Sequence, residues 1–147
     1  MRTIAPLGLD FRPVSALNIV DAGVFANMSV ADIRDRMSSN WGDFSRDPMN
    51  YRLHGGESIG DLVRRLSSFV VEVERQRKPV LIVSHFLNLQ VLYGYLLGRN
   101  VSEGLEMSIP LHTVIKLTPT QYGYKEERFD LRSTTLSEAI ARVDAAN

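Results

Sequence analysis

The stretch Pro79–His85 constrains the fold more than any other part of this chain. Its apolar run Val80–Val83 is rich in β-branched residues and predicts a short buried strand. A helical segment opens at once at Phe86 and runs to about Leu97, where Gly98 stops it. A strand, a sharp turn and a helix make half of a βαβ unit. The pattern therefore favours an α/β fold over an all-helical bundle.

Further elements are expected on both sides of this unit. Apolar residues repeat at helical spacing from Ile59 to Val73, so we expect an amphipathic helix from Glu57-Ser58 to Arg75-Gln76. The remaining expectations are a helix that starts at Ser29, a long polar connection over 38–57, a strand Thr113–Leu117 paired with residues 122–130 through a turn at Pro119–Gly123, and a small helix over Ser133–Val143.

Composition excludes several function classes. The 147 residues fit one domain, residues 1–147, and 17 basic residues balance 17 acidic ones. Without a basic excess there is little to drive binding to a phosphate backbone, so we expect no nucleic-acid partner. The apolar runs are too short to cross a bilayer, so no membrane partner is expected. The chain has no cysteine, which excludes disulfides and thiolate chemistry. We expect a cytoplasmic protein.

His85 is the residue that points most clearly to chemistry. It follows the expected strand and precedes the expected helix. Ligands of open α/β sheets bind at the carboxyl ends of strands, and a helix N-terminus favours anions. An imidazole there can donate a hydrogen bond, or a positive charge, to a bound phosphate. The alternative is a structural histidine that bonds to the backbone.

The other two histidines carry weaker signals. His54 lies in a glycine-containing polar loop with no apolar strand before it, so we interpret it as a loop residue and not as a nucleophile. His112 follows Pro110 at the entrance of a strand and is interpreted as structural. The three histidines are far apart in sequence and lack a carboxylate at ligand spacing, so we expect no metal site.

Five segments, taken in order, resemble the bisphosphatase half of the bifunctional 6-phosphofructo-2-kinase/fructose-2,6-bisphosphatases. That half belongs to the histidine phosphatase (phosphoglycerate mutase-like) superfamily. The resemblance covers about residues 17–123, and its last segment is more specific to the bisphosphatases than to the superfamily. The segments are Leu17–Gly23, Glu57–Leu66, Glu74–Gln76, Val80–His85 and Pro110–Pro119.

The resemblance implies a three-layer α/β domain, with helices on both faces of the sheet, that acts without metal or organic cofactor. In this family a histidine of an Arg-His-Gly motif attacks phosphorus, and a second histidine and two arginines hold the phosphoryl oxygens. A glutamate protonates the leaving sugar oxygen. His85 matches the second histidine and is the catalytic candidate. Arg2, in Met1–Ile4, matches a phosphate-binding arginine.

The chain departs from this family pattern at several positions. The strand and loop of the nucleophilic histidine are expected before residue 1, so we expect a partial domain without its first strand. Ile19 stands where Leu17-Asn18 should be followed by the acid glutamate, and an isoleucine gives no proton. Asp21 matches a different family aspartate. The positions that contact the sugar phosphate, or that follow the second histidine, are occupied by Val30, Phe44, Pro48, Ile59, Phe86 and Gln90, with Arg46 near Phe44.

These departures predict that the chain alone does not hydrolyse the 2-phosphate of fructose 2,6-bisphosphate. The expected ligand is a weakly bound sugar phosphate or phosphate ion. One alternative is a phosphatase of different specificity, completed by residues outside this chain. The other is a non-catalytic regulatory or interaction module that packs on a kinase domain or forms a homo-oligomer, because the absent strand would expose a sheet edge.

Overall fold

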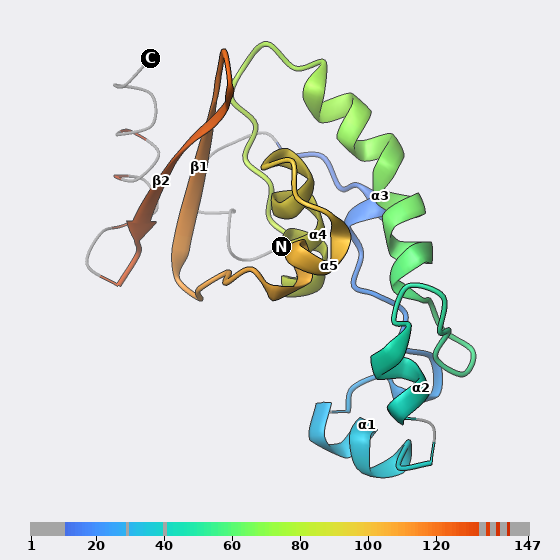
Figure 1. Ribbon diagram of the computed structural model, residues 1–147. Coiled ribbons are helices and arrows are strands. Elements are labelled where there is room, and N and C mark those ends of the chain that lie inside the picture. Colours follow the sequence, from blue (N-terminus) through green and yellow to red (C-terminus); the bar gives the residue numbers. More distant parts are fainter. Residues whose placement is uncertain are drawn as a thin grey trace. The chain divides into compact units, whose positions relative to one another are not determined.

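The computed structural model describes residues 11–28, 30–39 and 41–132, together with Thr135, Glu138 and Ala141 (Figure 1). Residues 14–92 form one compact unit, and a second contains Tyr93 and the residues after it. The elements are η2 (Ser15–Leu17), η3 (Gly23–Phe25), α1 (Val30–Arg36), α2 (Trp41–Arg46), α3 (Ile59–Glu74), α4 (Phe86–Leu96), α5 (Val101–Glu106), β1 (Thr113–Thr120) and β2 (Gly123–Asp130).

Helix α3 is the main packing element of the first unit, and it confirms the helix expected from Glu57-Ser58. Ser58 caps it: the Asp61 N–H donates to Ser58 Oγ at 3.1 Å, and the Asp61 carboxylate accepts the Ser58 N–H at 3.0 Å. This reciprocal capping box satisfies two donors that the helix cannot use itself. The apolar face is buried through Leu62, Leu66 and Phe69, which fixes the direction in which the opposite, polar face points.

The region expected as a loop over 38–57 contains helix α2, so that prediction is wrong in part. The Trp41 and Phe44 rings are 5.3 Å apart, and Phe44 meets Tyr51 edge-on at 5.8 Å. Such aromatic contacts hold a turn of helix that is too short to show a periodic pattern. The helix expected from Ser29 is present as α1; Ser29 itself lies outside the described residues.

The prediction of a strand at Val80–Val83 is wrong. The segment is extended but has no regular structure, and Val80, Leu81 and Val83 are 41–48% exposed. Among the described residues, no backbone hydrogen bond joins it to another segment. A β-strand requires hydrogen bonds to a neighbouring strand. The apolar, β-branched composition of the segment indicates a preference for β structure, but it does not show that such a neighbour is present.

Helix α4 follows directly, as predicted, and ends before Gly98. That glycine has φ +67°, the left-handed conformation that terminates many helices. Helix α5, which we did not predict, begins after Asn100, whose side chain accepts the Glu103 N–H at 2.9 Å. In the second unit α4 and α5 approach so closely at Gly94 that a Cβ there would lie 2.6 Å from the Gly104 Cα.

The hairpin expected in the C-terminal part is confirmed. Strands β1 and β2 pair antiparallel, from Thr113 opposite Asp130 to Thr120 opposite Gly123. Tyr93 of α4 donates its hydroxyl to Glu126, and Arg128 Nη2 donates to the Tyr93 hydroxyl at 3.0 Å. Burial and the Glu126 carboxylate raise the pKa of Tyr93. The polar network therefore fixes the hairpin on α4.

The α/β class is confirmed by this combination of helices with an antiparallel sheet. In the part of the chain that the structure describes, the sheet has two strands. Most of the helix expected over Ser133–Val143 lies outside the described residues. No helix among the described residues is both long enough and apolar enough to cross a bilayer.

Candidate functional site

His85 lies at the N-terminal end of α4, the longer of the helices after α3. Its backbone carbonyl accepts the Leu89 N–H at 3.0 Å, so His85 caps the helix and its imidazole is exposed. The first backbone N–H groups of a helix have no partner within it, and they carry the positive end of the helix dipole. An exposed imidazole beside these groups can donate a hydrogen bond to an anion in solution.

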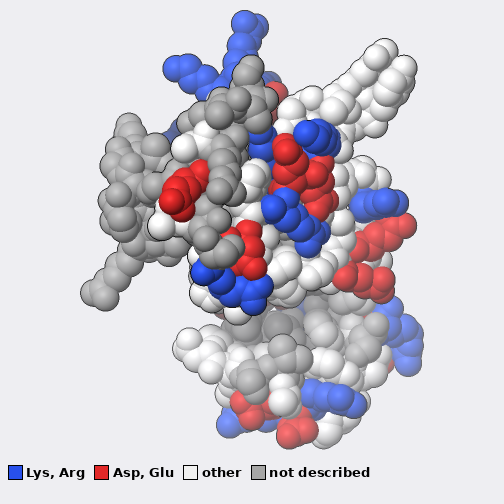
Figure 2. All heavy atoms as spheres, turned by 90° about the vertical axis from the view of Figure 1, so that its left-hand side faces the viewer, with Lys and Arg blue, Asp and Glu red and all other residues white. Residues whose placement is uncertain are grey.

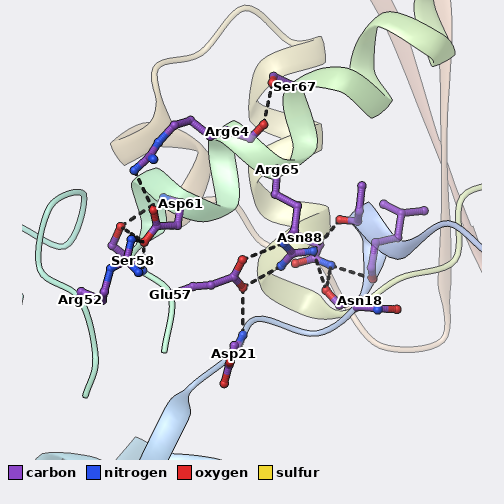
Figure 3. Close-up of polar contacts among 12 residues, drawn as sticks. Asn18, Asp21, Arg52, Glu57, Ser58, Asp61, Arg64, Arg65, Ser67 and Asn88 are labelled. Carbon is purple, nitrogen blue, oxygen red and sulfur yellow. Dashed lines mark hydrogen bonds and ion pairs between the residues drawn. The ribbon is translucent and has the colours of Figure 1, made fainter. Parts of the chain in front are cut away.

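The segment Leu17-Asn18 is bound directly to the turn that carries His85. Ser84 Oγ donates to the Leu17 carbonyl at 2.9 Å. The Asn88 side-chain nitrogen lies 2.9 Å from the Leu17 carbonyl, 2.8 Å from the Asn18 carbonyl and 3.0 Å from Ser84 Oγ (Figure 3). These contacts bring together two segments that are almost 70 residues apart in sequence.

Arg65 of α3 holds the same segment from the other side. Its Nε and Nη2 donate to the two carboxylate oxygens of Glu57 at 2.8 and 2.9 Å, and its Nη1 donates to the Ala16 and Asn18 carbonyls at 2.6 and 3.0 Å (Figure 3). This bidentate pair lowers the pKa of Glu57, through the Arg65 hydrogen bonds first and the Asp21 N–H second, against the opposing effect of burial.

Asp21 completes the network through its backbone. Its N–H donates to the Glu57 carboxylate at 3.0 Å, and its carbonyl accepts the Glu57 N–H at 2.7 Å. The Asp21 carboxylate accepts the Gly23 N–H at 2.8 Å. Gly23 has φ +55°, and a Cβ there would lie 2.1 Å from the His54 carbonyl oxygen, so only glycine fits this crossing. Asp21 thus stabilises a turn.

Comparison with known proteins identifies the family. The model of the histidine phosphatase superfamily (branch 1) matches residues 1–132. The chain belongs to this superfamily. It is 36% identical over 145 residues to rat 6-phosphofructo-2-kinase/fructose-2,6-bisphosphatase 3, which covers 99% of this chain and 26% of the relative. It is 38% identical over 127 residues to the bovine form 1, which covers 86% of this chain and 27% of the relative.

Plant and bacterial proteins extend the comparison. The Arabidopsis thaliana 6-phosphofructo-2-kinase/fructose-2,6-bisphosphatase is 34% identical over 116 residues, 79% of this chain and 16% of that protein. The chain thus spans about a quarter or less of the length of these relatives. The crystal structure of the alpha-ribazole phosphatase from Shigella flexneri superimposes with a TM-score of 0.72 at 16% identity, covering 86% of this chain and 64% of that one.

The predicted resemblance is therefore confirmed, and the chain is homologous to the fructose-2,6-bisphosphatase part of the bifunctional proteins. Ile19, which occupies the position where the resemblance predicts the acid glutamate, is 66% exposed. Ile19 follows Asn18, so the contacts of Asn88 and Arg65 place it next to the first turn of α4. The segment before position 19 is thus bound to residues on both sides of His85, Ser84 and Asn88.

Other predicted site residues have structural environments of their own. Arg2 lies outside the described residues, so its match to a phosphate-binding arginine stays a prediction. His54 is exposed in a turn, where its backbone carbonyl accepts the Val24 N–H at 3.1 Å. His112 precedes β1 in a left-handed conformation with φ +54°. No group of three or more potential metal ligands is present among the described residues.

The positions that the family resemblance assigns to sugar-phosphate contacts make packing or surface contacts in this structure. Phe44 belongs to the aromatic cluster of α2, and Ile59 is buried. The Pro48 carbonyl accepts the Ile59 N–H at 3.3 Å. Arg46, which lies near enough in sequence to replace a lost arginine, is exposed and pairs with Asp43 at 3.1 Å. These side chains pack the fold or lie at the surface.

Phe86 and Gln90, the replacements expected after the second histidine, lie on α4. Val30, another replaced position, is the first residue of α1. Gln90 is 5% exposed, whereas Phe86 is 57% exposed and does not fill the region beside His85 as a buried plug. Sequence reasoning missed Asn88 and Arg65 as the residues that organise the site. A single asparagine in the otherwise apolar first turn of α4, Phe86–Leu89, was the available signal for Asn88. Arg65 gave none, because two of its partners are backbone carbonyls.

Proposed function

We propose that this chain binds phosphate, or a sugar phosphate, weakly at His85 and the N-terminal end of α4, and that alone it does not hydrolyse fructose 2,6-bisphosphate. The observation that carries this proposal is Ile19. The position where the family has its acid is held beside the His85 turn, but its side chain is an exposed isoleucine. A phosphoryl transfer that needs a protonated leaving group has no donor there.

The altered sugar pocket supports weak binding. A hydrogen bond between a charged donor and an anion contributes about 1.5–3 kcal/mol. The loss of two of them corresponds to about 3–6 kcal/mol, or roughly a hundredfold to ten-thousandfold in Kd. Phe44 and Pro48 replace two such contacts, and Arg46 is already paired with Asp43. We therefore expect fructose phosphates to bind roughly a hundredfold to ten-thousandfold more weakly than they would to a site that keeps both contacts.

Two measurements test the two halves of this proposal. Phosphate release from fructose 2,6-bisphosphate is followed for the purified chain and for His85→Ala, and equal background rates are expected. Release above the His85→Ala background would contradict inactivity. Amide NMR spectra are recorded during titration with inorganic phosphate or fructose 6-phosphate, and shifts are expected at His85 and the first turn of α4. Unchanged signals there, or equal shifts in His85→Ala, would contradict binding at this site.

A phosphatase of different specificity is a second outcome of these assays. It would require a nucleophilic histidine from outside residues 1–147, and a trapped phosphohistidine in a longer chain would favour it. The expected independence from metals and organic cofactors stays a prediction. So does the cytoplasmic location, which fractionation of cells that express the tagged chain would test.

A non-catalytic interaction module is the other candidate function. The exposed side chains of Val80, Leu81, Val83 and Phe86 favour it, because four exposed large apolar residues within seven positions are a surface that a partner protein could cover. A kinase domain or a second copy of the chain would be the partner. Light scattering across a hundredfold range of concentration tests the second copy, and a monomer throughout would contradict that version of the proposal.

Charge on the hairpin face supports the prediction of no nucleic-acid partner. Figure 2 shows acidic and basic side chains interspersed on this face. Lys125 lies 3.4 Å from Glu127, and Arg128 and Arg132 bond to Glu126 and Asp130. Paired cations of this kind release few counterions from a phosphate backbone.

A further inference from the structure

Asn88 is a completely buried polar residue in the apolar helix α4. Its side-chain nitrogen faces three acceptors, which are the Leu17 and Asn18 carbonyls and Ser84 Oγ, all within 3.0 Å. Its oxygen Oδ1 is buried without a hydrogen-bond partner among the described residues. Three acceptors around one nitrogen fix the orientation of the amide. An unpartnered buried oxygen costs stability, so the contribution to stability alone does not explain why an asparagine stands here.

The contacts of Asn88 form one side of a clamp on the segment before position 19. The Leu17 carbonyl accepts hydrogen bonds from both Ser84 and Asn88. The Asn18 carbonyl accepts from both Asn88 and Arg65. The segment is thus held between α3 and α4, and the residue that follows it has a defined backbone position beside the first turn of α4.

We propose that Asn88 is a positioning residue that holds position 19 beside His85. The site of the missing acid therefore keeps its place, although its side chain is now Ile19. This inference rests on the proposed function for the meaning of position 19. It has a consequence for charge: a carboxylate introduced at position 19 lies close enough to His85 to sense its protonated imidazole, and it does so only while Asn88 is present.

The test is a mutant cycle followed by NMR titration of side-chain carboxyl groups. In Ile19→Glu, the pKa of the introduced carboxyl is compared with and without the second substitution His85→Ala. In water, a unit charge shifts the pKa of a neighbouring carboxyl by roughly half a unit at a separation of about 6 Å, and by less at a larger separation. We therefore expect the pKa of the introduced carboxyl to rise by about that amount when His85 is removed.

The same comparison is then made in the presence of Asn88→Leu. Leucine has the branched shape of asparagine, although it is larger, and it has no donor, while the Leu17 and Asn18 carbonyls keep their bonds to Ser84 and Arg65. The dependence on His85 should become clearly smaller, because the Leu17 and Asn18 carbonyls each lose one of their two donors. Tyr93→Phe is the matched control, because it removes another buried polar group of α4 whose partners lie on the hairpin. It should leave the dependence on His85 intact.

Two results would overturn the inference. One is a carboxyl at position 19 that titrates identically with and without His85 while Asn88 is present. The other is a dependence on His85 that survives Asn88→Leu unchanged. If Asn88→Leu does not fold, Ser84→Ala takes its place, since it removes a bond from the same clamp. A partial loss of the dependence on His85 is then expected. An unchanged dependence would contradict the clamp. No substrate enters this experiment, so its failure is distinct from a failure of phosphate binding.

Discussion

Arg65→Lys is the substitution that tests the structural centre of the site most directly. Arg65 makes four contacts of 2.6–3.0 Å, two to the Glu57 carboxylate and two to the Ala16 and Asn18 carbonyls. Its planar fork allows the two groups of contacts at once. A lysine ammonium is a point charge on a flexible stem and cannot bond to both sides in this geometry. We expect it to keep at most two of the four contacts.

The size of the loss follows from these contacts. A net hydrogen bond to a charged group contributes about 1.5–3 kcal/mol when it is buried, and less when solvent reaches it. The Arg65 and Glu57 side chains are each 22% exposed, so about 1–1.5 kcal/mol for each of two lost contacts is a fair figure. The total is about 2–3 kcal/mol. For a chain of this size that corresponds to a fall in Tm of about 4–12 °C.

Arg64→Lys is the matched control, because it makes the same chemical change one residue earlier in α3. Arg64 is 75% exposed, and its ion pair with Asp61 spans 2.7 Å at the surface. Exposed pairs of this kind contribute little to stability, so we expect a change in Tm of about 2 °C or less. Thermal unfolding followed by circular dichroism measures both variants. Equal losses in Arg64→Lys and Arg65→Lys would refute the account of Arg65.

Two further predictions concern stability. In Gly94→Ala the new Cβ would lie 2.6 Å from the Gly104 backbone, so the free energy of unfolding measured in urea should fall by about 1–3 kcal/mol. The control is Gly42→Ala, which has nothing within 4 Å of its Cβ and whose free energy of unfolding should rise by about 0.5–1 kcal/mol. The opposite order of stabilities would contradict the close approach of α4 and α5. Because Arg65 holds the pKa of Glu57 below its ordinary value, the stability from Glu57 is present above about pH 4.3 and is lost as the pH falls through the lower, folded-state pKa. Glu57→Gln should therefore be less stable at pH 7 and lose less stability than the parent between about pH 5 and pH 3; parallel curves for the two proteins in urea titrations would argue against this linkage.

The elements that the sequence predicted correctly are those set by local signals. The capping pair Ser58 and Asp61 begins α3, Gly98 ends α4, and the paired runs around Gly123 form the hairpin. Each signal acts over a few residues, so it can be interpreted without knowledge of the rest of the chain. The family resemblance was predictable for the same reason, because it rests on short segments in a fixed order.

The features that sequence reasoning missed depend on distant partners. The strand expected at Val80–Val83 required a neighbour to pair with, and composition does not supply one. Helix α2 depends on ring contacts that reach Tyr51. Asn88 bonds to backbone carbonyls about 70 residues away in sequence. Because every residue type has a backbone carbonyl, no pattern of side chains predicts this contact. The place of His85 at the start of α4 was therefore predictable from sequence, whereas the residues that bind the neighbouring segment were not.

The close approach of Gly94 and Gly104 limits how this chain can diverge. A side chain at position 94 requires a shift of the α5 backbone at Gly104, so a single substitution at position 94 costs stability unless α5 changes with it. Homologues that keep the α4–α5 corner should keep small residues at the two positions together. Those that acquire a larger residue at one of them should also have altered the length of the connection, which a comparison of divergent sequences would reveal.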